Sequence, residues 1–326
     1  MILRHFPTPW LFFVSLSVLC AQTPIATPAP TATGTNAKPA GTPPIVLHLP
    51  RLIPVTEGTV VPLWPAGKMP GLGADEPESQ TTSGNPSPDG NIILTNVSNP
   101  VMTVYKAPGV TGPAPAMIIC PGGGYGILAY KTEGTEIAAW LNSLGITGIV
   151  LKYRVPKNRD GAFQDIERAM RLARSNAADW GINPNQLGVI GFSAGGNLAV
   201  RLSTHFDTNA YDALDPADKL SCRPDYVVLV YAAYLSKGCN LSPDYPVTAN
   251  TPPTIAVHAA DDLPLMIGSI VYIGALEKVS VPCKLLIYKT GGHGYALHSN
   301  LDVRVWPVQV ADWLRKDRHL PLLDPK

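Results

Sequence analysis

The chain has 326 residues, with 25 Lys and Arg against 24 Asp and Glu, so its formal net charge is +1. This near neutrality gives no reason to expect nucleic acid or an anionic membrane as a partner. Hydrophobic residues make up 45% of the chain, which is enough for one sizeable core and too many for a chain disordered throughout. Of the 34 prolines, 16 lie in residues 1–90, so the chain divides into a proline-rich front and a globular rear.

The N-terminus has the pattern of a secretory signal peptide in residues 1–21. Arg4 precedes an apolar stretch at residues 10–19, which is too short to span a bilayer. We expect cleavage after Ala21 and export to the periplasm or the extracellular space. A lipid anchor at Cys20 is less favoured, because a leucine stands where a small residue would precede it; the alternative to export is an apolar arm. The remaining chain has no stretch of 18 apolar residues, so no membrane span is expected in the mature protein.

Two further segments precede the predicted catalytic domain. Residues 22–44 contain 17 Thr, Pro and Ala residues in 23, which indicates a semi-stiff linker without a core. Residues 45–90 mix apolar pieces, such as Ile45–Leu49, with a loop rich in Gly, Pro and Ser. We interpret residues 45–90 as an extended strap on the surface of a domain at residues 91–322, a size typical of one α/β domain.

The cysteines predict no metal site. After Cys20, the chain has no CxxC pair and no spacing typical of metal ligands. The reaction inferred below implies neither a metal nor an organic cofactor. A disulfide between Cys222 and Cys239 remains open. Oligomeric state cannot be read from the sequence.

Strand and helix patterns alternate through the rear of the chain. Apolar runs predict strands at Val101–Tyr105, Ala116–Cys120, Gly148–Tyr153, Leu187–Gly191, Tyr226–Tyr231, Thr254–His258 and Lys284–Tyr288. The alternating pattern of Val101–Tyr105 is typical of a strand at the edge of the sheet. Apolar residues at helical spacing predict helices around Ile137–Leu144, Ile166–Ala177, Ile270–Leu276 and Trp306–Leu314. This alternation predicts an α/β fold with a doubly wound, mostly parallel sheet flanked by helices. Ligands bind such sheets at the carboxyl ends of the strands.

A serine between glycines follows the predicted strand at Leu187–Gly191. The run from Gly191 to Gly195 reads G-F-S-A-G, and a helical pattern begins near Asn197. A serine on a tight strand-to-helix turn exposes its hydroxyl, and its neighbours two positions away must lack side chains to avoid collision. Ser193 is therefore the candidate nucleophile. The alternative is a glycine-rich helix start that Ser193 only caps.

A glycine-rich loop follows the predicted strand at Ala116–Cys120. The residues from Pro121 to Gly126 read P-G-G-G-Y-G. Acyl transfer generates an oxyanion that requires pre-aimed backbone amides, and glycines let the chain approach closely enough to supply them. We expect the amides of Gly123, Gly124 and Ala194 to form this oxyanion hole. The alternative, a phosphate-binding loop, lacks its usual lysine.

A candidate acid and a candidate base follow the last two predicted strands. Asp261 and Asp262 come after the strand that ends at His258, and His293 lies between glycines in a later loop. The order serine, acid, histidine along the chain matches a known arrangement of the catalytic triad. In it, His293 would act as general base and Asp262 would orient the imidazole. Asp261 is the alternative acid, and His258 is expected to be structural.

Together these motifs make the sequence resemble α/β hydrolases of the acetyl esterase/lipase group. It is similar to exported bacterial acetylxylan esterases and to bifunctional feruloyl/acetyl esterases. The resemblance runs from about Leu63 to Leu320 and rests on CPGGGYG at 120–126, LKYRVP at 151–156, GFSAGG at 191–196, HAADD at 258–262 and GGHGYAL at 291–297. The family pattern places the acid four residues after His258, which favours Asp262.

The sequence departs from this family pattern in two places. Pro121 replaces a histidine that often opens the glycine motif, so the outer part of the oxyanion loop must be held differently. Ile267-Gly268-Ser269 stands where relatives often carry Glu-Asn-Ser, which puts a polar contact near the acid loop in doubt.

The resemblance implies a secreted serine esterase that hydrolyses short-chain, preferably acetyl, esters through an acyl-enzyme. Only 17 residues, 235–251, separate Tyr234 from Pro252, which leaves no room for a large cap domain. An uncovered site suits an ester on a bulky soluble polymer such as acetylxylan. A generic short-chain carboxylesterase and a feruloyl esterase remain alternatives. Two alternatives from other classes are a serine peptidase of the prolyl-oligopeptidase kind and a non-catalytic binding module with a hydrolase fold.

Overall fold

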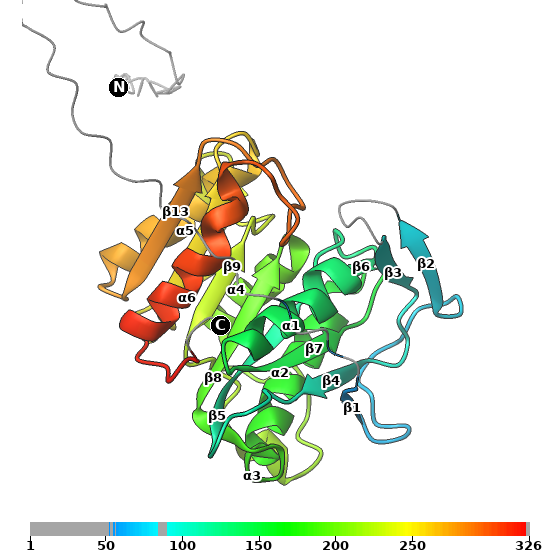
Figure 1. Cartoon of the computed structure of the whole chain (residues 1–326). Helices are drawn as coiled ribbons and strands as arrows, with labels where there is room; N and C mark the ends of the chain where they lie inside the picture. The colour runs from blue at the N-terminus through cyan, green and yellow to red at the C-terminus, as the bar shows by residue number, and fades with distance from the viewer. Residues whose placement is uncertain (1–51, 53–54, 56, 84–89, 324–326) are drawn as a thin grey trace, which may run out of the picture. The chain divides into compact units, whose positions relative to one another are not determined.

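The strands of the described residues form an open, mostly parallel sheet with helices on both faces (Figure 1). This computed structural model describes residues 52, 55, 57–83 and 90–323, so the predicted signal peptide, the linker and Ile45–Leu49 lie outside the described residues. In that part of the chain the main sheet has eight strands, in the order β1 (Thr59–Pro62), β4 (Val101–Tyr105), β7 (Thr147–Lys152), β5 (Ala114–Cys120), β8 (Ile182–Phe192), β9 (Val227–Val230), β12 (Thr254–Ala259) and β13 (Cys283–Tyr288).

The six strands from β7 to β13 in this order run parallel, whereas β4 is antiparallel to both β7 and β1. The helices between them are α1 (Glu136–Ser143), α2 (Arg159–Ser175), α3 (Ala177–Trp180), α4 (Ala194–His205), α5 (Leu265–Lys278) and α6 (Trp306–Lys316). The predicted doubly wound α/β sheet is thus confirmed.

The core lies on both faces of the sheet because successive side chains of a strand point to opposite sides. In β5, Met117 and Ile119 pack in one cluster with residues of α1 and α6. Ile118 and Cys120 pack in the other cluster, with residues of α2, α4 and α5. Helices α1 and α6 cover the near face of the sheet in Figure 1. This double coverage explains why the parallel strands are nearly continuous apolar runs.

The connection from β9 to β12 carries no cap domain. Its only regular structure within residues 231–253 is a hairpin of two short strands, β10 (Ser236–Lys237) and β11 (Asn240–Leu241). None of the helices in the described part of the chain combines the length and apolar character that crossing a bilayer needs.

The segment predicted as a surface strap contributes to the core and to the main sheet. Strand β1 pairs with β4, so Val101–Tyr105 is not the edge strand that the sequence predicted. Leu63 and Trp64, which follow β1, are 1% and 8% exposed. A smaller sheet joins β2 (Ser79–Ser83), β3 (Asn91–Thr95) and β6 (Leu128–Ala129). The α/β domain therefore begins before residue 91.

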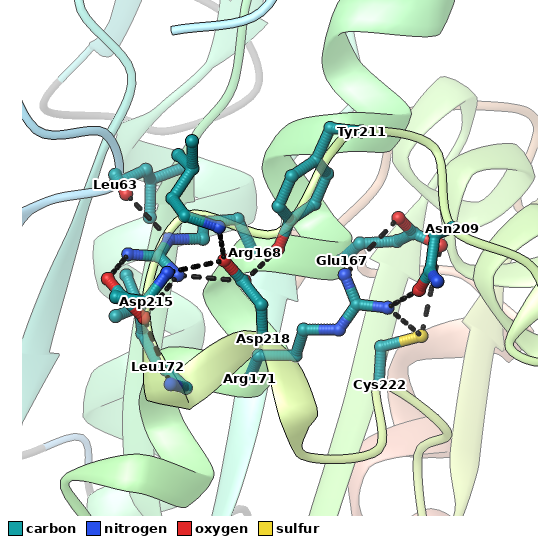
Figure 2. A network of polar contacts seen from close by, with 12 residues as sticks. Leu63, Glu167, Arg168, Arg171, Leu172, Asn209, Tyr211, Asp215, Asp218 and Cys222 are labelled. Atoms are coloured by element: carbon teal, nitrogen blue, oxygen red, sulfur yellow. Dashed lines mark hydrogen bonds and ion pairs between the residues drawn. The ribbon is translucent and has the colours of Figure 1, made fainter. Parts of the chain in front are cut away.

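Hydrogen bonds to two buried, ion-paired side chains of α2, Asp165 and Arg168, fasten this segment to the helix. Asp165 is fully buried and accepts hydrogen bonds from the Trp64 indole at 2.8 Å and from the Arg154 guanidinium at 3.0 Å. One turn further along α2, Arg168 donates to the Leu63 carbonyl at 3.0 Å and to the Asp218 carboxylate at 2.8 Å (Figure 2). These contacts hold residues that come directly after β1, so they also fix the outer strand.

Replacing Asp165 by asparagine is expected to lower the free energy of unfolding by about 3–5 kcal/mol, because it leaves the buried charge of Arg154 uncompensated. Urea denaturation measures this change. The matched control is Asp160→Asn on the same helix, whose carboxylate is 86% exposed and pairs with Arg201; we expect a change of about 1 kcal/mol or less. Equal effects of the two substitutions would contradict the assignment of Asp165 as the anchor.

The two cysteines considered for a disulfide are not bonded to each other. Cys222 is a buried free thiol 3.9 Å from the Arg171 guanidinium, whereas Cys239 is a free, exposed thiol in the turn between β10 and β11 (Figure 2 for Cys222). The burial of Cys222 raises the pKa of its thiol to about 12. This thiol is therefore a small core side chain rather than a redox partner.

Candidate active site

Loops at the carboxyl ends of β5, β8, β12 and β13 bring the candidate residues together. Ser193 follows β8, Asp262 follows β12, His293 follows β13, and the Gly123-Gly124 loop follows β5. Because these four strands are parallel, their carboxyl ends meet at one edge of the sheet.

Ser193 occupies a strained turn between β8 and α4. Its φ of 49° and ψ of −115° are rare for a residue with a side chain, and such strain persists where the surroundings fix the backbone. A Cβ on Gly191 would lie 2.3 Å from the Gly195 carbonyl oxygen, and one on Gly195 would lie 2.0 Å from that of Cys120. Both positions therefore have to be glycine for the turn to form, as the collision argument from the sequence expects.

Three side chains form a continuous hydrogen-bonded chain at this edge. The distance from Ser193 Oγ to His293 Nε2 is 2.8 Å, and that from His293 Nδ1 to Asp262 Oδ2 is 2.7 Å. Asp262 is 8% exposed, whereas the His293 side chain is 34% exposed and open to incoming molecules. A carboxylate can only accept, so His293 carries its proton on Nδ1 and leaves Nε2 free to accept from the Ser193 hydroxyl.

The neighbouring Asp261 takes a different position. Its carboxylate is exposed and accepts hydrogen bonds from the backbone amides of Gly291 at 3.2 Å and Gly292 at 2.9 Å. These amides lower the pKa of the Asp261 carboxyl. Asp261 thus supports the loop that carries His293, while Asp262 is the carboxylate that contacts the imidazole.

His258 is fully buried against Asp262, in keeping with its expected structural role. Its Nε2 lies 2.9 Å from Asp262 Oδ2, and its Nδ1 lies 2.8 Å from Ser269 Oγ. Burial lowers the pKa of His258, so the ring is neutral; Nε2–H donates to Asp262, and Nδ1 accepts from the Ser269 hydroxyl. Ser269 therefore supplies a polar contact behind the acid loop, although the family's Glu-Asn pair before it is absent.

The neutral His258 predicts a loss of stability in mild acid. A histidine whose folded-state pKa is depressed contributes stability that is present above its unfolded pKa, about 6.5, and is lost as the pH falls below that value. We expect the free energy of unfolding to fall between pH 7.5 and pH 5, and this fall to shrink in His258→Gln. Urea denaturation across this range measures it, with the exposed His319→Gln as control. Identical slopes for all three proteins would refute the argument.

Two of the three candidate oxyanion residues, Gly123 and Gly124, line a cavity beside Ser193. No described residue accepts a hydrogen bond from the amides of Gly123 and Gly124. The amide of Ala194 is the first of α4, where the helix provides no carbonyl for it. The cavity has a volume of about 350 Å³ and is lined by Asn91, Gly123, Gly124, Ala129, Thr132, Glu133, Ser193, His293 and Gly294.

Two buried residues of the site, Glu133 and Tyr231, escaped the sequence analysis. Glu133 accepts hydrogen bonds from the Gly122 amide at 2.6 Å and from the Tyr231 hydroxyl at 2.9 Å. The same hydroxyl accepts from the Ala296 amide at 3.1 Å, and the Tyr231 ring centroid lies 4.9 Å from that of His293. Glu133 and Tyr231 thus connect the glycine loop to the histidine loop. Burial raises the pKa of Glu133, although its two hydrogen bonds favour the carboxylate.

Glu133 holds the Gly122 amide, which helps explain how the loop is fixed although Pro121 stands at its start. No spacing in the sequence marks this residue, because it lies in a π-helical turn, Lys131–Thr135, outside the periodic face of α1. Among the described residues, no group of three or more His, Cys, Asp or Glu side chains is arranged to hold a metal ion.

Comparisons with known proteins agree with this fold. The family model BD-FAE matches residues 102–234. An acetylxylan esterase of Xylanibacter ruminicola is 33% identical over 198 residues, which are 55% of this chain and 41% of that protein. Endo-1,4-beta-xylanase B of Butyrivibrio fibrisolvens is 29% identical over 55% of this chain and 32% of its own length. The chain therefore spans about two fifths and one third of these longer relatives.

A solved structure matches over almost its whole length. The acetyl ester-xyloside bifunctional hydrolase of Caldicellulosiruptor lactoaceticus is 32% identical, with a TM-score of 0.67, and the match covers 82% of this chain and 98% of that one. The sheet order, the strained serine turn and these matches agree with one another. The chain is therefore a carboxylic ester hydrolase of the α/β-hydrolase fold and belongs to the same family as this bifunctional hydrolase, with the BD-FAE model matching its central part.

Proposed function

We propose that this chain is an exported serine esterase that removes acetyl groups from a plant polysaccharide such as acetylated xylan. The observation that carries the proposal is the hydrogen-bonded series Ser193–His293–Asp262 beside two amides without acceptors. The names of the similar proteins support the substrate class, since they describe an acetylxylan esterase, a xylanase and a hydrolase of acetyl esters and xylosides.

The first half of the reaction forms an acyl-enzyme. Ser193 Oγ attacks the ester carbonyl carbon while His293 Nε2 takes the hydroxyl proton. The carbonyl oxygen becomes an oxyanion and accepts hydrogen bonds from the amides of Gly123, Gly124 and Ala194. Asp262 stabilises the imidazolium. When the C–O bond of the ester breaks, His293 returns its proton to the alcohol oxygen, and the acetyl group remains on Ser193.

The second half of the reaction releases the acid. His293 Nε2 removes a proton from a water molecule, whose oxygen attacks the acyl carbonyl carbon. The same amides hold the second oxyanion. Its collapse breaks the bond to Ser193 Oγ, which recovers a proton from His293, and acetate leaves.

The surroundings of the site favour a small acyl group on a bulky alcohol. The cavity beside Ser193 is about 350 Å³, and the β9–β12 connection carries only a short hairpin where a cap would stand. A polymer can therefore approach the site while its acetyl group enters the cavity.

The test compares acetate release from acetylated xylan with hydrolysis of methyl ferulate, tributyrin and p-nitrophenyl acetate. We expect acetylxylan to be the preferred natural substrate. A higher kcat/KM for methyl ferulate would identify a feruloyl esterase, and one for tributyrin a generic carboxylesterase. Preference for an Xaa-Pro anilide over p-nitrophenyl acetate would overturn the esterase mechanism and indicate a peptidase.

Export is tested separately, through expression of the full chain in a bacterial host. We expect mass spectrometry of the exported protein to find a mature N-terminus after Ala21. Retention of residues 1–21 in the cytoplasmic fraction would contradict export without affecting the assignment of the site.

A further inference from the structure

An arginine between two tyrosines stands next to the glycine loop. The Arg159 guanidinium carbon lies 4.8 Å from the ring centroid of Tyr125 and 4.8 Å from that of Tyr234. Tyr125 is buried, whereas Tyr234 is 43% exposed and Arg159 is exposed. Because Arg159 occupies one face of the Tyr234 ring, the exposed surface of that ring belongs to its other face and its edges.

The guanidinium of Arg159 has hydrogen-bonding capacity to spare. An arginine side chain carries five N–H donors, and no described residue accepts a hydrogen bond from those of Arg159. Stacking between two rings nevertheless holds the group in one place, so its donors are pre-positioned at low entropic cost. An ordinary surface arginine lacks these two ring contacts and moves freely.

Tyr234 is fixed in an unusual backbone conformation. Its φ is 60°, which is rare for a residue with a side chain. Its carbonyl accepts hydrogen bonds from the side-chain nitrogen of Asn197 and from the Tyr245 hydroxyl, both at 3.3 Å. The side-chain oxygen of Asn197 in turn accepts a hydrogen bond from the Tyr125 hydroxyl at 2.9 Å. Strain of this kind is retained where the surroundings over-determine it, and it clusters at ligand-binding sites.

The position of Tyr234 connects it to the active site. Its hydroxyl lies 3.6 Å from the point that a Cβ on Gly124 would occupy, and Gly124 lines the cavity together with Ser193. The Ala233 amide also donates to the Ser193 carbonyl at 3.0 Å. Tyr234 thus lies beside Gly124, next to the cavity that holds the candidate nucleophile, and Arg159 lies against Tyr234; we call these two residues the rim.

We propose that Tyr234 and Arg159 form a sugar-binding subsite for the alcohol part of the ester. The proposal rests on the esterase function given above and adds which residues contact the sugar that carries the acetyl group. The C–H face of a pyranose ring packs on the open face of an aromatic ring, and sugar hydroxyls accept hydrogen bonds from guanidinium donors. A purely apolar acyl chain would leave these donors unpaired and desolvated, so the chemistry of the rim favours a hydroxyl-rich ligand.

The test uses Tyr234→Ala and Arg159→Gln, each assayed on acetylated xylo-oligosaccharides, p-nitrophenyl acetate and methyl ferulate. We expect kcat/KM for the oligosaccharides to fall about tenfold in each variant, mainly through KM, and to fall several times less for p-nitrophenyl acetate. Arg223→Gln is the matched control, since Arg223 stacks on an aromatic ring, that of Phe206, which has no contact with Gly124 or with the Tyr234 ring. We expect Arg223→Gln to keep the wild-type ratio between substrates.

A second measurement separates this proposal from the proposed function. Unacetylated xylohexaose should inhibit hydrolysis of p-nitrophenyl acetate by the wild-type chain, with an inhibition constant that rises about tenfold in Tyr234→Ala. If the wild-type chain does not release acetate from the oligosaccharides, the substrate proposed above is wrong, and this inhibition alone decides on the subsite. Absence of inhibition, equal losses on all esters, or a loss confined to methyl ferulate would each overturn the sugar subsite.

Discussion

Replacing Ser193 by alanine is expected to lower kcat on p-nitrophenyl acetate by about 10⁶-fold, as loss of the nucleophile does in serine hydrolases that act through a comparable triad. Without Oγ no acyl-enzyme can form, and the residual rate comes from water activated by His293 beside the oxyanion amides. Initial rates on enzyme shown to be folded by its thermal unfolding curve measure the loss.

The control for this substitution is Ser203→Ala on the same helix. The Ser203 hydroxyl is buried and donates to the Ala199 carbonyl at 2.7 Å, so the control removes a serine from α4 without touching the cavity. An organophosphonate ester should label the peptide that contains Ser193 in the wild-type chain and in Ser203→Ala, and should leave Ser193→Ala unlabelled. Near-normal turnover by Ser193→Ala would show that the nucleophile is another residue.

Replacing Asp262 by asparagine is expected to lower kcat by about 10⁴-fold. The asparagine amide can donate to His293 Nδ1, which moves the imidazole proton to Nε2 and removes the acceptor that Ser193 requires. Both imidazoles contact the same carboxylate oxygen, Oδ2, so an amide nitrogen at that position would also face the Nε2–H of His258, which needs an acceptor. Activity and the stability of the variant are measured together, because the two effects have different causes.

Asp261→Asn is the matched control because it changes the adjacent carboxylate in the same way. Its exposed side chain contacts only the amides of Gly291 and Gly292 among the described residues, and an asparagine oxygen still accepts from one of them. We expect its kcat to fall less than about tenfold, in line with the loss of one exposed hydrogen bond. A larger loss in Asp261→Asn than in Asp262→Asn would reverse the assignment of the acid.

The sequence predicted the parallel part of the fold well because burial on both faces leaves an unmistakable pattern. The runs at Ala116–Cys120 and Tyr226–Tyr231 are apolar throughout, and both correspond to central strands. Strand β1 escaped prediction because it is an exposed four-residue edge strand ending in Pro62, stabilised by its pairing with β4. Helix α5 begins at Leu265, earlier than predicted; it is apolar on nearly every side, and Ile270, predicted to lie on its buried face, is 44% exposed.

Some residues of the candidate site could likewise be predicted from the sequence, whereas others could not. Ser193, Asp262 and His293 could be proposed from the sequence because each follows a recognisable strand and has glycines or a second acid as neighbours. Glu133 and Tyr234 could not be, because their positions depend on a π-helical turn and on a strained backbone that no periodicity encodes. Local sequence signals report which strand precedes a loop, whereas contacts between loops follow from tertiary packing.

The outer strand β1 has a practical consequence for anyone who excises this hydrolase or grafts it onto a carbohydrate-binding module. A recombinant piece that started at residue 91 would lack β1, Leu63 and Trp64, and it would expose the edge of β4 to pairing with other polypeptides. We therefore place the N-terminal boundary of the smallest transferable domain before Thr59. Shorter pieces should precipitate even though they retain every residue that surrounds the nucleophile.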